Sequence, residues 1–319
     1  MNLLRKIQIA STMPVLALPA RAKKSKVGGQ AIIEGVMMRS RKKVSWAVKK
    51  HDGETAVEHF PFISATDKNK ILDIPVMRGT IYLFETLKLG FRALSRSAEL
   101  AYEEEQQNSG KKSFKDIVST ALSFVIAIAA SVGIFMYLPI LLLTWFGYEK
   151  SAFEFNVYAG SIRIGLFLLY LFLISLWKDV RRVFEYHGAE HKAIFTYEDD
   201  KELTVENMRP YKTFHPRCGT SFLILVGAIC IGLFAIIDSI MLKWVIETYP
   251  AHIRLLVHLL LIPIVSGTSY EFLKLSDKYQ HIPPVNFLIQ PGLWLQRITT
   301  KEPDENQLVI ASQALKAAL

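Results

Sequence analysis

Four long runs of apolar residues constrain this chain more than any other feature. The first, Ile117–Phe146, is almost entirely apolar, carries no charge and exceeds the roughly 20 residues that a helix needs to cross a bilayer. The second covers 157–177 if Arg163 snorkels to the membrane surface. The third and fourth cover 222–237 and 253–272. With a mean hydropathy of +0.24, the sequence predicts a mainly α, polytopic membrane protein with about four transmembrane helices.

The positions of lysine and arginine predict how these helices are oriented. Segment 1–116 holds 21 of the 38 basic residues and 178–220 holds 8, whereas 147–160 holds only Lys150. Basic loops next to spans stay on the cytoplasmic side. We therefore expect both termini and the 178–220 connection to be cytoplasmic.

The start of the chain imitates a signal peptide, with a basic start, an apolar run and Ala20-Arg21-Ala22. Export would place the basic segment outside, so cleavage is not expected. Cys218 would face a reducing compartment and Cys230 lies in an apolar run, so no disulfide is expected either. The predicted segments are a basic extension (1–27), a cytoplasmic cap (28–112), two spans (113–178), a cytoplasmic connection (179–220), two spans (221–273) and a cytoplasmic C-terminal segment (274–319).

The cap is predicted to be a small α/β unit. Val44–Val48 alternates large and small residues, Asp52-Gly53 supplies a turn and Thr55–Phe60 follows, which is typical of a β-hairpin. Residues 30–38 read as one further strand. From Thr80 to Glu105, apolar residues recur at helical spacing and predict an amphipathic helix.

The pattern His187-Gly188-Ala189-Glu190-His191 places two imidazoles one helical turn apart with a carboxylate beside them. Such a pair can bind one metal ion while Glu190 reaches water bound to the metal, as in an inverted zinc-protease motif. His215 and Cys218 follow in the motif His215–Ser221. Mixed nitrogen and sulfur donors favour Zn²⁺, although another divalent ion also fits.

The number of ligands decides between two kinds of zinc site. If His187, His191, His215 and Cys218 all bind, the site is closed and structural. If one stays away, a water fits and Glu190 can act as catalytic general base in hydrolysis of an amide or ester. A third reading has no metal, with the histidines at a wet helix end.

Three further acidic residues remain open to interpretation. Asp238 and His258 lie at similar depth in the last two spans, where they either pair or meet water near the outer surface. Glu271, 80 residues after His191, is a candidate metal ligand, but a carboxylate at a helix end usually meets water or a basic side chain. Glu34 receives no definite role.

The net charge of +9 lies in the N-terminal segment. Anionic lipid headgroups are its expected partner, since each basic residue near a bilayer contributes about 1 kcal/mol of attraction. The stretch from Arg39 to Lys43 could instead contact phosphate of ribosomal or other RNA; no recognised RNA-binding motif accompanies it.

Four motifs together resemble the YqhQ family of bacterial multi-pass membrane proteins, from about Lys26 to Leu319. They are Gly28–Arg39, His187–His191, His215–Ser221 and Pro291–Gln296. The family has no known function and is often labelled a predicted metal-dependent enzyme. The resemblance implies a bacterial cell-membrane location and no particular reaction.

Two functional hypotheses follow. One is an accessory or scaffold protein that binds a membrane-protein partner, in membrane-protein insertion or quality control, with a metal clamping its cytoplasmic cap. The alternative is a membrane-embedded zinc-dependent hydrolase or protease that uses Glu190 as base. The potentially closed ligand set and the large charged cytoplasmic surface favour the first.

Overall fold

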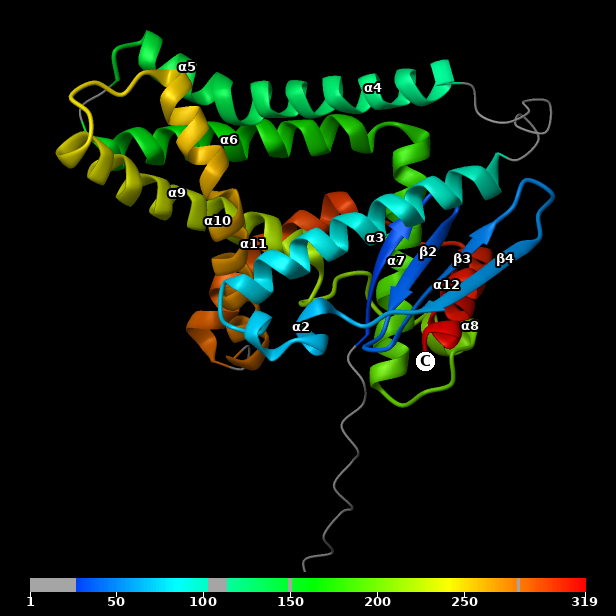
Figure 1. The fold of residues 1–319 in the computed structure, drawn as a ribbon. Coiled ribbons are helices and arrows are strands. Elements are labelled where there is room, and N and C mark those ends of the chain that lie inside the picture. The colour runs from blue at the N-terminus through cyan, green and yellow to red at the C-terminus, as the bar shows by residue number, and fades with distance from the viewer. Residues whose placement is uncertain (1–26, 103–113, 149–150, 280–281) are drawn as a thin grey trace, which may run out of the picture.

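The N-terminal part of the structure is a four-stranded antiparallel sheet whose strands pair in chain order (Figure 1). In this computed structural model, which describes residues 27–102, 114–148, 151–279 and 282–319, the strands are β1 (Gly28–Ile32), β2 (Gly35–Arg39), β3 (Lys43–Lys49) and β4 (Thr55–Pro61). The predicted hairpin is confirmed as β3 and β4, which pair from Lys49 with Thr55 outward. The prediction of one strand over 30–38 is wrong, because the chain reverses at Glu34, whose φ is 51°.

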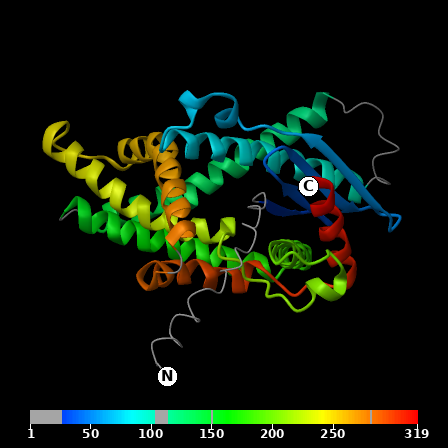
Figure 2. The same cartoon turned by 90° about the horizontal axis from the view of Figure 1, so that it is seen from below.

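Helices cover both faces of the sheet (Figure 2). Met37 and Trp46 pack against α3 (Met77–Ala101) on one face. Val36 and Met38 pack on the other face against α7 (Lys178–Glu198) and α12 (Glu305–Ala318). Neighbours along β2 alternate between the two cores because successive strand residues point to opposite faces. The amphipathic helix predicted over Thr80–Glu105 is found as α3, which ends at Ala101; residues 103–105 lie outside the described residues.

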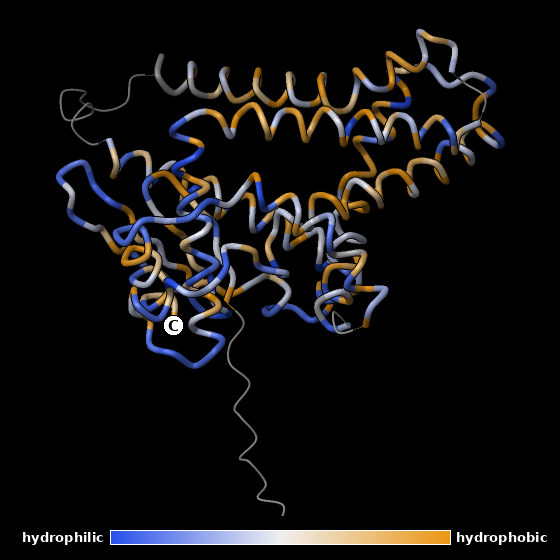
Figure 3. Tube along the Cα trace, turned by 180° about the vertical axis from the view of Figure 1, so that it is seen from behind, coloured by the Kyte–Doolittle hydropathy of each residue, from blue (hydrophilic) through white to orange (hydrophobic). Residues whose placement is uncertain are grey.

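In the described part of the chain, four helices are long and apolar enough to cross a membrane, as predicted. The first rod joins α4 (Phe114–Val132), a π-helical turn η3 (Gly133–Tyr137) and α5 (Leu138–Trp145); the others are α6 (Ala152–Ser175), α9 (Gly219–Trp244) and α10 (Ala251–Tyr279). The two helices labelled α4 and α6 lie side by side at the top of Figure 1. Figure 3 shows them from behind, where most of their length has the colour of hydrophobic residues.

The remaining helices lie in the stretches that connect or follow these elements. The prediction named no secondary structure for the C-terminal segment, yet it forms α11 (Pro283–Thr299) and α12. Three short helical turns complete the described chain: α2 (Ala65–Lys68), η1 (Lys70–Leu72) and α8 (Val205–Met208).

The α/β domain is fastened to the fourth long helix through α3. Gly79 of α3 lies against Gly267 of α10 so closely that a Cβ atom on Gly79 would be 2.8 Å from the Gly267 carbonyl oxygen. Arg78 beside it donates to both carboxylate oxygens of Glu271, the first contact 2.6 Å long. Glu271 is therefore paired with a basic side chain and lies outside the histidine cluster.

Both cysteines are free, as expected for a chain without a disulfide. Of the predicted basic extension (1–27), residues 1–26 lie outside the described part of the chain, which begins at Val27. Within the described basic stretch, Arg39 pairs with Glu85 at 3.0 Å and Arg41 with Asp67 at 3.1 Å.

Candidate metal centre

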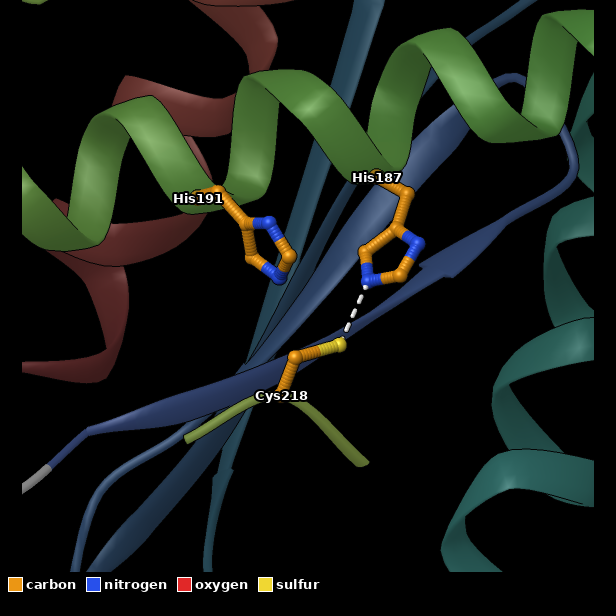
Figure 4. Close-up of side chains that lie close together, drawn as sticks. All are labelled: His187, His191 and Cys218. Atoms are coloured by element: carbon orange, nitrogen blue, oxygen red, sulfur yellow. Dashed lines mark hydrogen bonds between the residues drawn. The ribbon is translucent and has the colours of Figure 1, made fainter. Parts of the chain in front are cut away.

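The structure brings His187, His191 and Cys218 together, with one candidate ligand atom of each within 4.8 Å of the others. The two histidines share the face of α7 that their spacing predicts, and Cys218 is the N-cap residue of α9. Figure 4 shows Cys218 facing the two imidazoles, with His187 Nε2 and Cys218 Sγ 3.1 Å apart. Three metal-ligating side chains from two segments therefore converge.

Backbone carbonyls fix the orientation of both imidazole rings. His187 Nδ1 donates to the carbonyl of Thr299 at 2.8 Å, and His191 Nδ1 donates to the carbonyl of Thr213. A carbonyl only accepts, so the ring hydrogen lies on Nδ1 and the Nε2 lone pair stays available. Metal-bound histidines are typically held in this way, with the ring nitrogen that does not bind the metal donating to a carbonyl or carboxylate.

Two close backbone approaches build this arrangement. Gly188 lies so near the chain after α11 that a Cβ atom there would be 2.0 Å from the carbonyl oxygen of Lys301. Gln296 of α11 holds the other segment, because its side chain accepts from the amide of His215 at 2.7 Å and donates to the carbonyl of His215 at 2.9 Å. The end of α11 thus positions both carbonyls that orient the rings.

Burial and hydrogen bonding prepare the side chains for a metal ion. The side chain of His191 is 1% exposed and that of Cys218 is 6% exposed. Burial lowers the pKa of His191 and keeps the imidazole neutral. Burial opposes ionisation of Cys218, but the neighbouring His191 and Thr220 outweigh this effect and lower its pKa. Neutral imidazole and thiolate are the forms that bind a metal.

His215, the fourth predicted ligand, lies beside the cluster and is not one of the three converging side chains. Its ring centre is 5.6 Å from that of His191, and its Nδ1 accepts from the amide of Arg217 at 3.2 Å. Its Nε2 faces the carboxylate of Glu198 at 3.6 Å. The three donors are thus a His₂Cys set, which suits Zn²⁺ with one further coordination position.

Glu190 lies next to the cluster on the side of the sheet edge. Its side chain is 4% exposed, and the amide of Gly29 in β1 donates to its carboxyl group. The other oxygen, Oε2, is buried without a hydrogen-bond partner among the described residues. Burial raises the pKa of Glu190 to about 8.

Glu34 has a role in the domain rather than in the cluster. Its carboxylate accepts from the guanidinium of Arg182 and from the hydroxyl of Tyr186 at 3.3 Å, which fastens the turn between β1 and β2 to α7.

Sequence reasoning missed the residues that support the cluster: Gly29, Gly188, Gln296 and Thr299. Three of them lie within the motifs that suggested the family, and Thr299 lies three residues after Gln296. A glycine or glutamine carries no metal chemistry of its own, so only its presence in a shared motif could have drawn attention to it.

The described chain thus combines an α/β domain, four apolar helices of membrane-spanning length and a His₂Cys cluster in which His191 and Cys218 are buried and His187 is half-buried. A family model described as "Protein of unknown function (DUF1385)" matches residues 74–319. The chain is 32% identical over 306 residues to the "Uncharacterized protein YqhQ" of Bacillus subtilis (strain 168), and the alignment covers 92% of each chain. The chain belongs to this YqhQ family. No solved structure matches it.

Proposed function

We propose that this protein is an integral membrane accessory protein whose α/β domain is clamped to its third span by Zn²⁺. The observation that carries the proposal is the convergence of His187 and His191, both oriented by backbone carbonyls, on the N-cap cysteine of α9. A metal there would link α7, which carries both histidines, to the start of α9, the third span. Because the three donor side chains are largely shielded from solvent, a zinc ion bound there would chiefly stabilise the fold.

The proposed topology places this domain in the cytoplasm. The charge distribution puts both termini and the 178–220 connection on that side. The packing agrees, because Tyr148, Ala251 and Leu255 cluster where the first and second pairs of spans turn, far from the sheet (Figure 1). A reporter after Leu319 and one near Asp200 should be cytoplasmic, and one near Ala152 external. An external Asp200 reporter contradicts this topology.

The proposed partner is a second membrane protein that acts in membrane-protein insertion or quality control, with anionic lipid headgroups beside the basic N-terminal segment. A large charged domain held at the membrane surface supports this proposal. Affinity purification from solubilised membranes tests it. Co-purification of ribosomal RNA without a protein partner would favour the RNA alternative instead.

One observation favours a second function, a zinc-dependent hydrolase. His215 is not one of the three converging side chains, so a metal held by those three would keep one coordination position for a water. Among the described residues Oε2 of Glu190 has no hydrogen-bond partner, and once ionised the carboxylate would accept a proton from that water. The metal would supply the lowered pKa of the water and the polarisation of a substrate carbonyl.

The variant Glu190→Gln separates the two functions, because glutamine keeps the shape and removes the base. A clamp retains its metal and its cellular role in this variant. A hydrolase retains the metal and loses the role. Glu206→Gln, the same change at an exposed position of α8, is the matched control.

A further inference from the structure

Charged and polar side chains lie in contact between the helices that are proposed to cross the membrane. Asn156 of α6, Asp238 of α9 and His258 of α10 are all fully buried, and Arg254 of α10 is 3% exposed. Ionisable groups at such positions are costly in hydrocarbon and usually line functional sites. Of the two alternatives for Asp238 and His258, pairing or contact with water, the structure shows the pair, with His258 Nε2 and Asp238 Oδ1 3.0 Å apart.

Asp238 is the centre of this cluster and both of its oxygens are engaged. Oδ1 accepts from His258 Nε2 at 3.0 Å, and Oδ2 accepts from Asn156 Nδ2 at 2.7 Å. The guanidinium of Arg254 lies 3.5 Å from Oδ2. Asp238 thus lies close to His258, Asn156 and Arg254, and among the described residues it forms no ion pair within 4.0 Å with the second arginine nearby, Arg163.

His258 joins Asp238 to Arg163 and is neutral. Its Nε2 carries the hydrogen that Asp238 accepts, which leaves Nδ1 as an acceptor. Nδ1 faces the guanidinium of Arg163 at 3.5 Å. A hydrogen on Nδ1 would point at a cation, so the charged imidazole does not fit this contact.

Arg163 is the cation that this cluster leaves without a carboxylate. Among the described residues, its guanidinium also contacts the carbonyl of Met136 at 3.5 Å and the ring of Phe234 at 5.4 Å. Its Nε is buried without a hydrogen-bond partner among the described residues. These are weak contacts for a half-buried guanidinium, which can donate five hydrogen bonds.

The depth of Arg163 rules out the predicted snorkelling. It lies eleven residues after Ala152 and twelve before Ser175, so each end of the span is roughly 17 Å away at 1.5 Å per residue. That distance exceeds the length of an arginine side chain. The side chain turns toward the π-helical turn η3 of the first span instead.

We propose that Arg163 binds one anionic group, the phosphate or carboxylate of a lipid-like amphiphile, within the bundle. A bidentate oxyanion would pair the guanidinium and use its free Nε hydrogen. An amphiphile fits because the surrounding helices expose apolar side chains such as Leu168 and Leu169, along which its chains can lie. The inference rests on the proposed membrane insertion and is independent of the metal clamp.

Native mass spectrometry of the delipidated full-length protein tests this inference. The protein is titrated with phosphatidylglycerol, oleate, phosphatidylcholine or inorganic phosphate. Wild type should bind one phosphatidylglycerol or oleate at least tenfold more tightly than phosphatidylcholine. Arg163→Gln should lose that preference, Arg163→Lys should retain part of it, and Lys243→Gln, at an exposed position at the end of α9, should behave as wild type.

Several results would overturn the inference. Equal binding of phosphatidylglycerol and phosphatidylcholine by wild type does so without any variant, so the test survives if Arg163→Gln does not fold. An unchanged preference in folded Arg163→Gln also overturns it. Binding of inorganic phosphate without either amphiphile shows that the site takes a free ion and overturns the lipid assignment. Release of the chain from membranes by alkaline carbonate refutes the membrane proposal separately.

Discussion

The substitution Gly188→Ala tests how the cluster is built, because it adds one methyl group where two backbones touch. The new Cβ atom would lie 2.0 Å from the carbonyl oxygen of Lys301, whereas ordinary contact begins at 3.4 Å. The segment after α11 must therefore move by about 1.4 Å, the difference between the two distances. Lys301 N donates to the carbonyl of Phe184 at 2.9 Å, and Thr299 accepts from His187 at 2.8 Å, and both bonds cross this contact.

The expected cost follows from these contacts. Overpacking costs roughly 1–3 kcal/mol, and each lost hydrogen bond adds about 1 kcal/mol. We expect Gly188→Ala to destabilise the protein by about 2–4 kcal/mol. Loss of the Thr299 carbonyl from His187 should also weaken metal binding by roughly 10- to 100-fold, the usual effect of removing such support.

Thermal unfolding of the purified protein and a competition titration with a zinc chelator measure the two effects. Gly165→Ala is the matched control, because a Cβ atom at that helical glycine meets nothing within 4 Å. A Gly188→Ala protein with wild-type stability and wild-type zinc affinity would show that the close approach does not position the cluster.

Three other predictions concern separate parts of the structure. In metal-free protein, Glu190 has a folded pKa of about 8 because of burial, so the folded state binds the extra proton. Stability should fall as pH rises from about 4.5 to 8, and Glu190→Gln should flatten this slope in urea titrations. For the pair Asp238 and His258, Asp238→Asn combined with His258→Gln should cost less than the sum of the single changes; additive costs would argue against coupling. Arg182→Gln should destabilise the domain by about 1–3 kcal/mol by leaving Glu34 partly buried without its partner, and a wild-type melting curve would contradict this.

The long apolar helices and the β3–β4 hairpin could be predicted from the sequence, because local sequence specifies them with little help from long-range packing. A run of apolar residues such as Ile117–Phe146 specifies a long helix by composition alone, and the turn at Asp52-Gly53 specifies its hairpin locally. The reversal at Glu34 was missed because a non-glycine residue with φ of 51° carries no clear sequence signal. The helix α12 was missed because its role, covering the sheet from the far end of the chain, is a tertiary contact.

The candidate site was predictable only in part, for a related reason. Helical periodicity places His187 and His191 on one face without any tertiary information. The position of Cys218 relative to His215 depends on how Gln296 holds the loop before α9, more than 70 residues later in the chain. Spacing in the sequence could therefore nominate four ligands, while the fold determines which three converge.

The metal content of the purified protein tests the central proposal most directly. Mass spectrometry of protein prepared without chelator should find about one zinc ion per chain, and His187→Ala and Cys218→Ser should each lose it. His252→Ala and Cys230→Ser, which change the same residue types outside the cluster, should keep it. Wild-type protein without stoichiometric metal would contradict both the clamp and the hydrolase, and would leave the two histidines as hydrogen-bonding parts of the α/β domain.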